Sequence, residues 1–294
     1  QPLAMPSFAA AGPTAAGPRP HWVWHCHLDM TEAREEVWLL LRPHAERYDA
    51  VLFDVEAFAR PDLRGPQVRI VAPCVDPLSP RNIALPQETI TTILERYGID
   101  PQRPLLCQVS PFSEWADPLG ALEVFTQVRQ EMPYLQLVLA TNYMVEDAVS
   151  QVAFEKVSEK AVGDPDIYLF CTLQDVGSTC INALQRAAGV VMQKALGRGF
   201  GLWLSEALWK EKPVVAGRAP GPQAQLLDGL SGYLCSTPEE FAQRILSILA
   251  NPSLARRLGQ AGREHVQSRL LITHLLKDYL SLFRQLTLSK GGRS

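Results

Sequence analysis

Short apolar runs alternate with longer amphipathic segments from residue 85 onward, and this alternation constrains the fold more than any other feature. The amphipathic segments keep their apolar residues at helical spacing, whereas the short runs have the composition of buried strands. Buried strands that alternate with helices indicate a parallel sheet covered on both faces. The sequence therefore predicts an α/β, Rossmann-like domain over residues 81–262, with strands expected at 104–109, 135–140, 167–171, 190–192 and 213–216.

The two ends of the chain differ from this regular middle. A chain of 294 residues is long for a single hydrophobic core, so we expect more than one domain. Residues 1–20 are largely Ala, Pro and Gly, a composition that predicts a disordered segment within a partial N-terminal domain over residues 1–80. Residues 263–294 are predicted to form a crossing helix, centred on 270–286, and a tail.

Charge and cysteine usage exclude several classes of function. The formal net charge is −3 and like charges form no long run, so we expect no binding of nucleic acid or of an anionic membrane. The apolar runs are too short to span a membrane. Six scattered cysteines without CxxC spacing indicate buried thiols in a reducing compartment, and no signal peptide is visible. We therefore expect a soluble, cytoplasmic protein.

Three loops are candidates for a binding site, because ligands of open parallel sheets lie outside the carboxyl ends of the strands. They span residues 110–117, 197–201 and 217–222. The second loop, Gly-Arg-Gly-Phe-Gly, opens a helix that carries Glu206. Its glycines would let the backbone approach a phosphate at the helix N-terminus, and Glu206 could accept ribose hydroxyls. The same glycines could equally serve a tight strand-to-helix turn, and Glu206 could be a solvated surface residue.

Two histidines and two tryptophans have simpler interpretations. His25 and His27 alternate along a predicted strand and so share a face, but no third metal ligand lies near them in sequence. We expect no metal site and assign both histidines to a cleft or to the interior. Trp115 and Trp209 are expected to be packing residues rather than platforms that bind sugars.

The motifs of the chain resemble those of a known enzyme family. Its sequence is similar, over nearly the whole length and in the same order, to the trehalose-forming retaining GT-B glycosyltransferases, a family of the glycogen and sucrose synthase type. The motifs that carry this resemblance are WHCHLD (24–29), VDPLS (75–79), QVSPFSEWADPLG (108–120), GRGFGLWLSEALWKEKPVV (197–215) and the final LLITHLLKDYL.

The resemblance implies a fold, a reaction and a set of residues. It implies two Rossmann-like domains, the C-terminal one binding NDP-glucose as donor substrate and the N-terminal one holding the acceptor glucose. Glucose would be transferred with retention to form trehalose, without a cofactor or a metal, and a homodimer would be possible. His27 and Asp29 match the acceptor cleft, and the donor-site positions are Arg198, Gly199, Phe200, Gly201, Leu202, Glu206 (for the ribose) and Gly221.

Several positions depart from the family pattern. The Arg and Lys that grip the donor diphosphate correspond here to Pro111 and Ala116, and the first Glu of the E-x7-E motif corresponds to Arg198. His25 replaces a family Arg, and Pro220 replaces the first glycine of a pair. A charge-assisted contact to phosphate contributes about 1.5 to 3 kcal/mol. The losses predict a severe defect in donor transfer unless Arg198 supplies the missing cation.

Two functions follow, and the residues leave both open. One is an active trehalose-forming glucosyltransferase, and the other is a catalytically degenerate relative that serves as a binding or scaffold module. Residues 1–3 resemble a stretch well inside the N-terminal domain of the family, so we expect the front half of that domain to be missing. A second chain could supply it.

Overall fold

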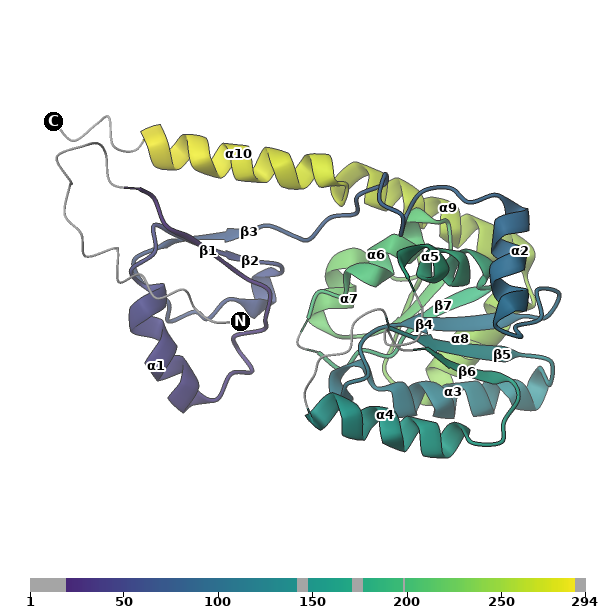
Figure 1. Cartoon of the computed structure of the whole chain (residues 1–294). Coiled ribbons are helices and arrows are strands. Elements are labelled where there is room, and N and C mark those ends of the chain that lie inside the picture. Colours follow the sequence, from purple (N-terminus) through teal and green to yellow (C-terminus); the bar gives the residue numbers. More distant parts are fainter. Residues whose placement is uncertain (1–19, 142–147, 171–176, 198, 289–294) are drawn as a thin grey trace, which may run out of the picture. The chain divides into compact units, whose positions relative to one another are not determined.

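The computed structural model divides the chain into two compact units. It describes residues 20–141, 148–170, 177–197 and 199–288 (Figure 1). Unit 1 comprises Gln1–Pro73, Arg198–Phe200 and Thr273–Ser294, and unit 2 comprises Cys74–Gly197 and Gly201–Ile272. The disorder predicted for residues 1–20 therefore falls almost wholly outside the described residues.

Unit 2 contains the Rossmann-like sheet that the alternation of the sequence predicts. Six strands, all parallel, follow the order β6-β5-β4-β7-β8-β9. Each expected strand is present, and β9 was not anticipated. The bounds are β4 (Leu105–Val109), β5 (Gln136–Ala140), β6 (Ile167–Phe170), β7 (Val190–Gln193), β8 (Val214–Gly217) and β9 (Tyr233–Cys235).

Helices cover both faces of this sheet. Figure 1 shows α3, α4 and α8 on one face and α5 and α6 on the other. The helices of unit 2 are α2 (Gln87–Arg96), α3 (Pro118–Glu131), α4 (Ala148–Ala161), α5 (Ser178–Ala187), α6 (Leu202–Trp209), α7 (Pro220–Gln225), α8 (Pro238–Leu249) and α9 (Pro252–Arg269).

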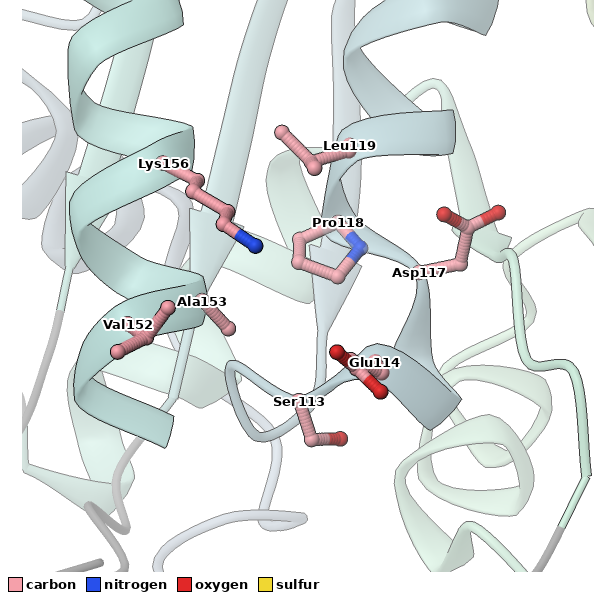
Figure 2. A pocket seen from close by; sticks show the side chains of 8 residues that line it. All are labelled: Ser113, Glu114, Asp117, Pro118, Leu119, Val152, Ala153 and Lys156. Carbon is pink, nitrogen blue, oxygen red and sulfur yellow. The ribbon is translucent and has the colours of Figure 1, made fainter. Parts of the chain in front are cut away.

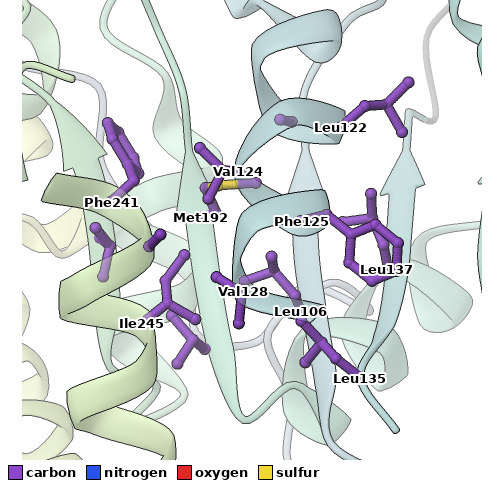
Figure 3. Close-up of a cluster of buried hydrophobic side chains, with 14 of the residues drawn as sticks. Leu106, Leu122, Val124, Phe125, Val128, Leu135, Leu137, Met192, Phe241 and Ile245 are labelled. Carbon is purple, nitrogen blue, oxygen red and sulfur yellow. The ribbon is translucent and has the colours of Figure 1, made fainter. Parts of the chain in front are cut away.

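The main hydrophobic core lies between the sheet and the α3 and α8 helices. Phe125 of α3, Ile245 of α8 and Met192 of β7 are fully buried in it (Figure 3). Each such side chain contributes about 1.5–3 kcal/mol when it leaves water. Because all six strands on which this core packs are parallel, their outgoing loops lie at one edge of the sheet, where the candidate site is built.

Unit 1 contains a smaller parallel sheet of order β1-β2-β3. Trp38, Phe53 and Phe58 are buried on one face, and Leu52 and Leu282 are buried on the other. Its elements are β1 (Val23–Cys26), α1 (Glu35–Ala45), β2 (Ala50–Phe53), β3 (Gln67–Ile70) and α10 (Ile272–Leu288), with short 3-10 turns at Glu56–Phe58 and, in unit 2, at Glu114–Ala116.

The boundary and the last helices differ from the expected arrangement. The division falls at Cys74 and near Ile272 rather than at residues 80 and 262. Helix α9 was not anticipated, although the Asn251 cap and Pro252 at its first position mark its start. The predicted last helix is present as α10 and packs on the unit 1 sheet. Within the described residues, the helices are either too short or too polar to cross a membrane.

Candidate functional site

The loops after β4 and β7 meet at the point where the chain order of the unit 2 sheet reverses. Strand β4 pairs with β5 on one side and with β7 on the other. The loop at 110–117 continues into α3, and the loop at 194–201 continues into α6. A crevice outside the carboxyl ends at such a switch point is where ligands bind in open α/β sheets.

An ion pair joins these two loops. The Lys194 ammonium lies 3.1 Å from Asp117 Oδ2, and only 8% of the Lys194 side chain is exposed. The ammonium also lies 5.3 Å from the centre of the Phe241 ring. Asp117 has a φ of +46° and caps α3 by accepting a hydrogen bond from the Gly120 N–H. One carboxylate therefore fixes the start of α3 and holds the cation of the neighbouring loop.

Hydrogen bonds to backbone atoms hold the two loops together as well. The buried Gln108 side chain donates to the Ala116 carbonyl at 2.9 Å and accepts from the Lys194 N–H at 3.0 Å. The Leu196 N–H donates to the Trp115 carbonyl at 2.8 Å. Pro111 is half-buried and Ala116 is buried. The two positions expected to hold diphosphate-binding cations thus carry no charge and lie in a well-bonded loop.

A pocket of about 450 Å³ lies beside the first loop, between α3 and α4. In Figure 2, the Lys156 ammonium and the Glu114 carboxylate face the space between the helices, whereas the Asp117 carboxylate is turned away from α4. The remaining lining is mainly apolar and includes Pro118 and Leu119. The pocket can therefore take an apolar or aromatic group with a cation at its rim.

Glu206, the predicted ribose ligand, forms a buried ion pair with Arg81. It lies on α6 with only 4% of its surface exposed. Arg81 Nε is 2.9 Å from Oε1, and Arg81 Nη2 is 2.8 Å from Oε2. Both carboxylate oxygens thus accept from one guanidinium. The ribose role of Glu206 stays a prediction, but the alternative of a solvated surface glutamate is wrong.

A second buried cation extends this polar cluster. Lys210 Nζ donates to Gln185 Oε1 at 2.7 Å and to Asn82 Oδ1 at 3.0 Å. Burial lowers the pKa of Lys210 to about 7, although the nearby Glu206 carboxylate opposes the shift. Asn182 donates to the carbonyls of Pro80 and Ile83, so the cluster clamps the segment around residue 81 to α5 and α6.

The other predicted donor residues lie along the second and third loops. Gly201 has a φ of +73° and caps α6, of which Leu202 is the first residue. Arg198 lies outside the described residues, and Gly199 and Phe200 are grouped with unit 1. Gly221 is buried in the short α7. These residues therefore follow the neighbouring strands β7 and β8.

The third loop approaches the second closely at one glycine. A Cβ atom on Gly217 would lie 2.4 Å from the Ala195 carbonyl oxygen, so only glycine fits there. The next residue, Arg218, pairs with Asp228 at 3.0 Å. Pro220 stands at the first position of α7, where its missing N–H leaves no intrahelical bond unmade.

The predicted acceptor residues lie in unit 1, at the carboxyl end of β1. His27 has 46% of its side chain exposed, and its Nδ1 lies 2.8 Å from Asp54 Oδ1. Asp29 accepts from the Thr31 N–H and hydroxyl in a local turn. His25 Nε2 lies 3.1 Å from the same Asp54 oxygen. Asp54 and Lys194 were missed by sequence reasoning. Asp54 directly follows an apolar run, a signal that could have found it, whereas Gln193 separates Lys194 from the apolar run 190–192.

Comparison with known proteins identifies the class of this chain. The family model "Glycosyl transferases group 1" matches residues 89–265, and "Trehalose synthase, N-terminal domain" matches residues 1–60. The structure resembles the sucrose-phosphate synthase of Thermosynechococcus elongatus, with a TM-score of 0.76 and 19% identity over 92% of this chain and 68% of that one. It also resembles HepE of Anabaena with UDP and glucose, with a TM-score of 0.78 and 15% identity over 91% of this chain and 72% of that one. The predicted GT-B type α/β fold is confirmed.

The chain belongs to the group 1 glycosyltransferase family. It is 40% identical to the trehalose synthase of Rubrobacter xylanophilus and 34% identical to that of Thermococcus litoralis, over 90% of this chain in both cases. It spans 64% of the length of these two relatives. Within this family the chain is thus related to trehalose synthase, as the motifs indicate.

Proposed function

We propose that this chain acts in the transfer of glucose, with retention, from NDP-glucose to glucose to form trehalose. The 40% identity with a trehalose synthase over 90% of the chain carries the proposal. A protein of similar fold supports donor binding, because the structure of HepE has been solved in complex with UDP-glucose. No cofactor is needed in this proposal, since the nucleotide is part of the donor substrate.

The switch point of unit 2 offers a place for the donor diphosphate. The N-termini of α3 and α6 face it with backbone N–H groups that favour anions. Lys194 is a cation at this point, and it would contact phosphate by exchanging Asp117 for the ligand. Glu206 would bind the ribose by giving one oxygen of its Arg81 pair to a hydroxyl. Arg198 would add a second cation, as its place at the glycine-rich helix start suggests.

The acceptor would be held by unit 1 in this proposal. The Nε2 of His27 is available for a sugar hydroxyl, since its Nδ1 is used by Asp54. Asp29 would accept a second hydroxyl with its remaining oxygen lone pairs.

A turnover assay tests the proposal. Purified protein is incubated with UDP-, ADP- or GDP-glucose and glucose, and both trehalose and free NDP are measured. Trehalose formed in equal amount to NDP supports transfer, whereas NDP with free glucose shows hydrolysis. Absence of both products, in a sample that binds NDP by calorimetry, contradicts the transferase assignment.

A second candidate is a catalytically degenerate binding module. It is favoured by uncharged Pro111 and Ala116 and by the ion pairs that already engage Lys194 and Glu206. This alternative predicts neither trehalose nor NDP from NDP-glucose and glucose, whether or not the chain binds the nucleotide. Trehalose formed in equal amount to NDP would contradict it.

Unit 1 supports a further proposal about partners. Leu39 and Leu40 of α1 are exposed, Leu40 by 69%, and so are Val68 and Ile70 of β3. Apolar surface of this kind marks interaction sites. We propose that a second copy of this chain covers it. Light scattering coupled to gel filtration tests the homodimer, and a monomer at every concentration contradicts it.

The cysteines support a cytoplasmic location. Burial raises the pKa of Cys107 to about 12 and that of Cys26 and Cys235 to about 11, so these groups are unreactive thiols. Cell fractionation tests the location, and recovery in a secreted fraction contradicts it.

A further inference from the structure

Two histidines and an aspartate converge at the carboxyl end of the unit 1 sheet. His25 lies on β1 and His27 directly follows this strand, with their rings 4.1 Å apart, and Asp54 directly follows β2. The strands pair in parallel with Cys26 opposite Phe53, so continuing this register by one residue brings Asp54 beside His27. The three ligand atoms all lie within 4.8 Å of one another. Strand pairing thus supplies the third group that is absent from the local sequence.

The distances fit a metal ion. His25 Nε2 and His27 Nδ1 lie 3.1 and 2.8 Å from the same oxygen, Oδ1 of Asp54. Ligands of a tetrahedral ion with bonds of about 2.0–2.2 Å lie roughly 3.3 Å apart. The two nitrogen–oxygen separations therefore need to widen by only a few tenths of an ångström, and the two ring nitrogens already lie within 4.8 Å of each other. A single cation would then replace the N–H protons that the two rings now donate to the carboxylate.

The outer contacts of the cluster also fit a metal ion. Metal-binding histidines commonly donate their second ring N–H to a fixed partner, which orients the ring. The other nitrogen of His25, Nδ1, lies 2.6 Å from the Tyr279 hydroxyl of α10. Only 2% of the Asp54 side chain is exposed, whereas 46% of the His27 side chain is exposed. The carboxylate is thus held in place, and the site is open to solvent on the side of His27.

We propose that His25, His27 and Asp54 form a binding site for one divalent transition-metal ion of the Zn²⁺ class. Two imidazoles and one carboxylate select such ions over Mg²⁺ and Ca²⁺, which prefer oxygen ligands. Three protein ligands leave a coordination position for water or for a ligand hydroxyl. Cys26 takes no part, because it points to the opposite face of β1 and is buried among Trp38 and Phe53.

Calorimetric titration of the full chain without a histidine tag tests the site. ZnCl2 is expected to bind with a stoichiometry of one, and MgCl2 is expected not to bind at the same concentrations. Co²⁺ should give the visible absorption of a four- or five-coordinate ion. Absence of stoichiometric Zn²⁺ binding at micromolar concentration overturns the proposal.

Variants assign the binding to these residues. His25→Arg keeps a partner for Asp54, so the protein should fold while its Zn²⁺ affinity falls by more than the roughly 10- to 100-fold typical of losing an outer partner. Tyr279→Phe keeps all three ligands and should weaken binding by about tenfold. His44→Gln, on α1 of the same unit, is the control and should bind as the parent does. Equal affinity in the parent and in His25→Arg would show that the metal binds elsewhere.

Anomalous diffraction from crystals of the parent protein tests the site even if a variant fails to fold. Crystals of the parent protein soaked in ZnCl2 should show an anomalous peak bonded to His25 Nε2, His27 Nδ1 and Asp54. A peak at other residues, with none here, overturns the proposal.

Discussion

The carboxyl ends of the two parallel sheets are built from similar parts but carry opposite chemistry. In unit 2, Lys194 and Arg81 each hold a carboxylate, so positive and negative groups neutralise each other. In unit 1, two imidazoles share one buried carboxylate, and among the described residues no Lys or Arg forms an ion pair with it. The first arrangement is satisfied without a ligand, whereas the second gains from a cation. A ligand of unit 2 must therefore displace an existing ion-pair partner, whereas a cation can bind in unit 1 without displacing another cation.

The largest effect is expected where the unit 2 charges are most deeply buried. Glu206→Gln leaves the Arg81 guanidinium without its carboxylate, and removal of one partner of a buried pair costs about 3 kcal/mol or more. The free energy of unfolding from urea titration measures the loss. Arg218→Gln breaks the exposed pair with Asp228 and should cost less than about 1 kcal/mol. Equal losses in the two variants would show that the Glu206 pair is no more than a surface contact.

The pH dependence of stability should reveal the buried Lys210. Its pKa is about 7 in the folded protein and has the ordinary value of 10.5 in the unfolded chain, so between these values the unfolded chain binds the extra proton. Stability should therefore rise with pH above 7, by up to about 1.4 kcal/mol per pH unit, and fall toward pH 7. Lys212, with a pKa lowered to about 8, acts in the same direction.

Urea unfolding at pH 7.0, 7.75 and 8.5 measures this slope. Lys210→Met should flatten it, and only the slope is compared because the variant also leaves Gln185 without its donor. Lys212→Met serves as the second variant and should flatten the slope less. An unchanged slope in Lys210→Met would contradict a lowered pKa for this lysine.

The sequence predicted the sheet of unit 2 far better than the contacts of its site. Strand and helix periodicity is local, so every expected strand was found. Ion pairs such as Arg81 with Glu206 join residues that are 125 positions apart, and no local pattern reports them. The partner of His25 was hidden for the same reason, because only the pairing of β1 with β2 brings Asp54 to it.

The smallest expected effect tests whether the Asp117 carboxylate competes with a diphosphate for the Lys194 ammonium. Asp117→Asn keeps a good cap for α3 and a residue that tolerates a positive φ, but it removes the negative charge beside Lys194. If Asp117 competes with diphosphate for the ammonium, UDP affinity should rise by about threefold to tenfold, which corresponds to roughly 1 kcal/mol.

Calorimetry with UDP measures this change, and Lys194→Met should lose the gain when it is combined with Asp117→Asn. The double variant separates a freed ammonium from a loosened loop, because only the first explanation needs the lysine. Tighter UDP binding that persists without Lys194 would contradict competition at this ion pair. An affinity that does not change in either variant would place the diphosphate away from the junction of the β4 and β7 loops. Ligand binding in unit 2 would then not require displacement of Asp117.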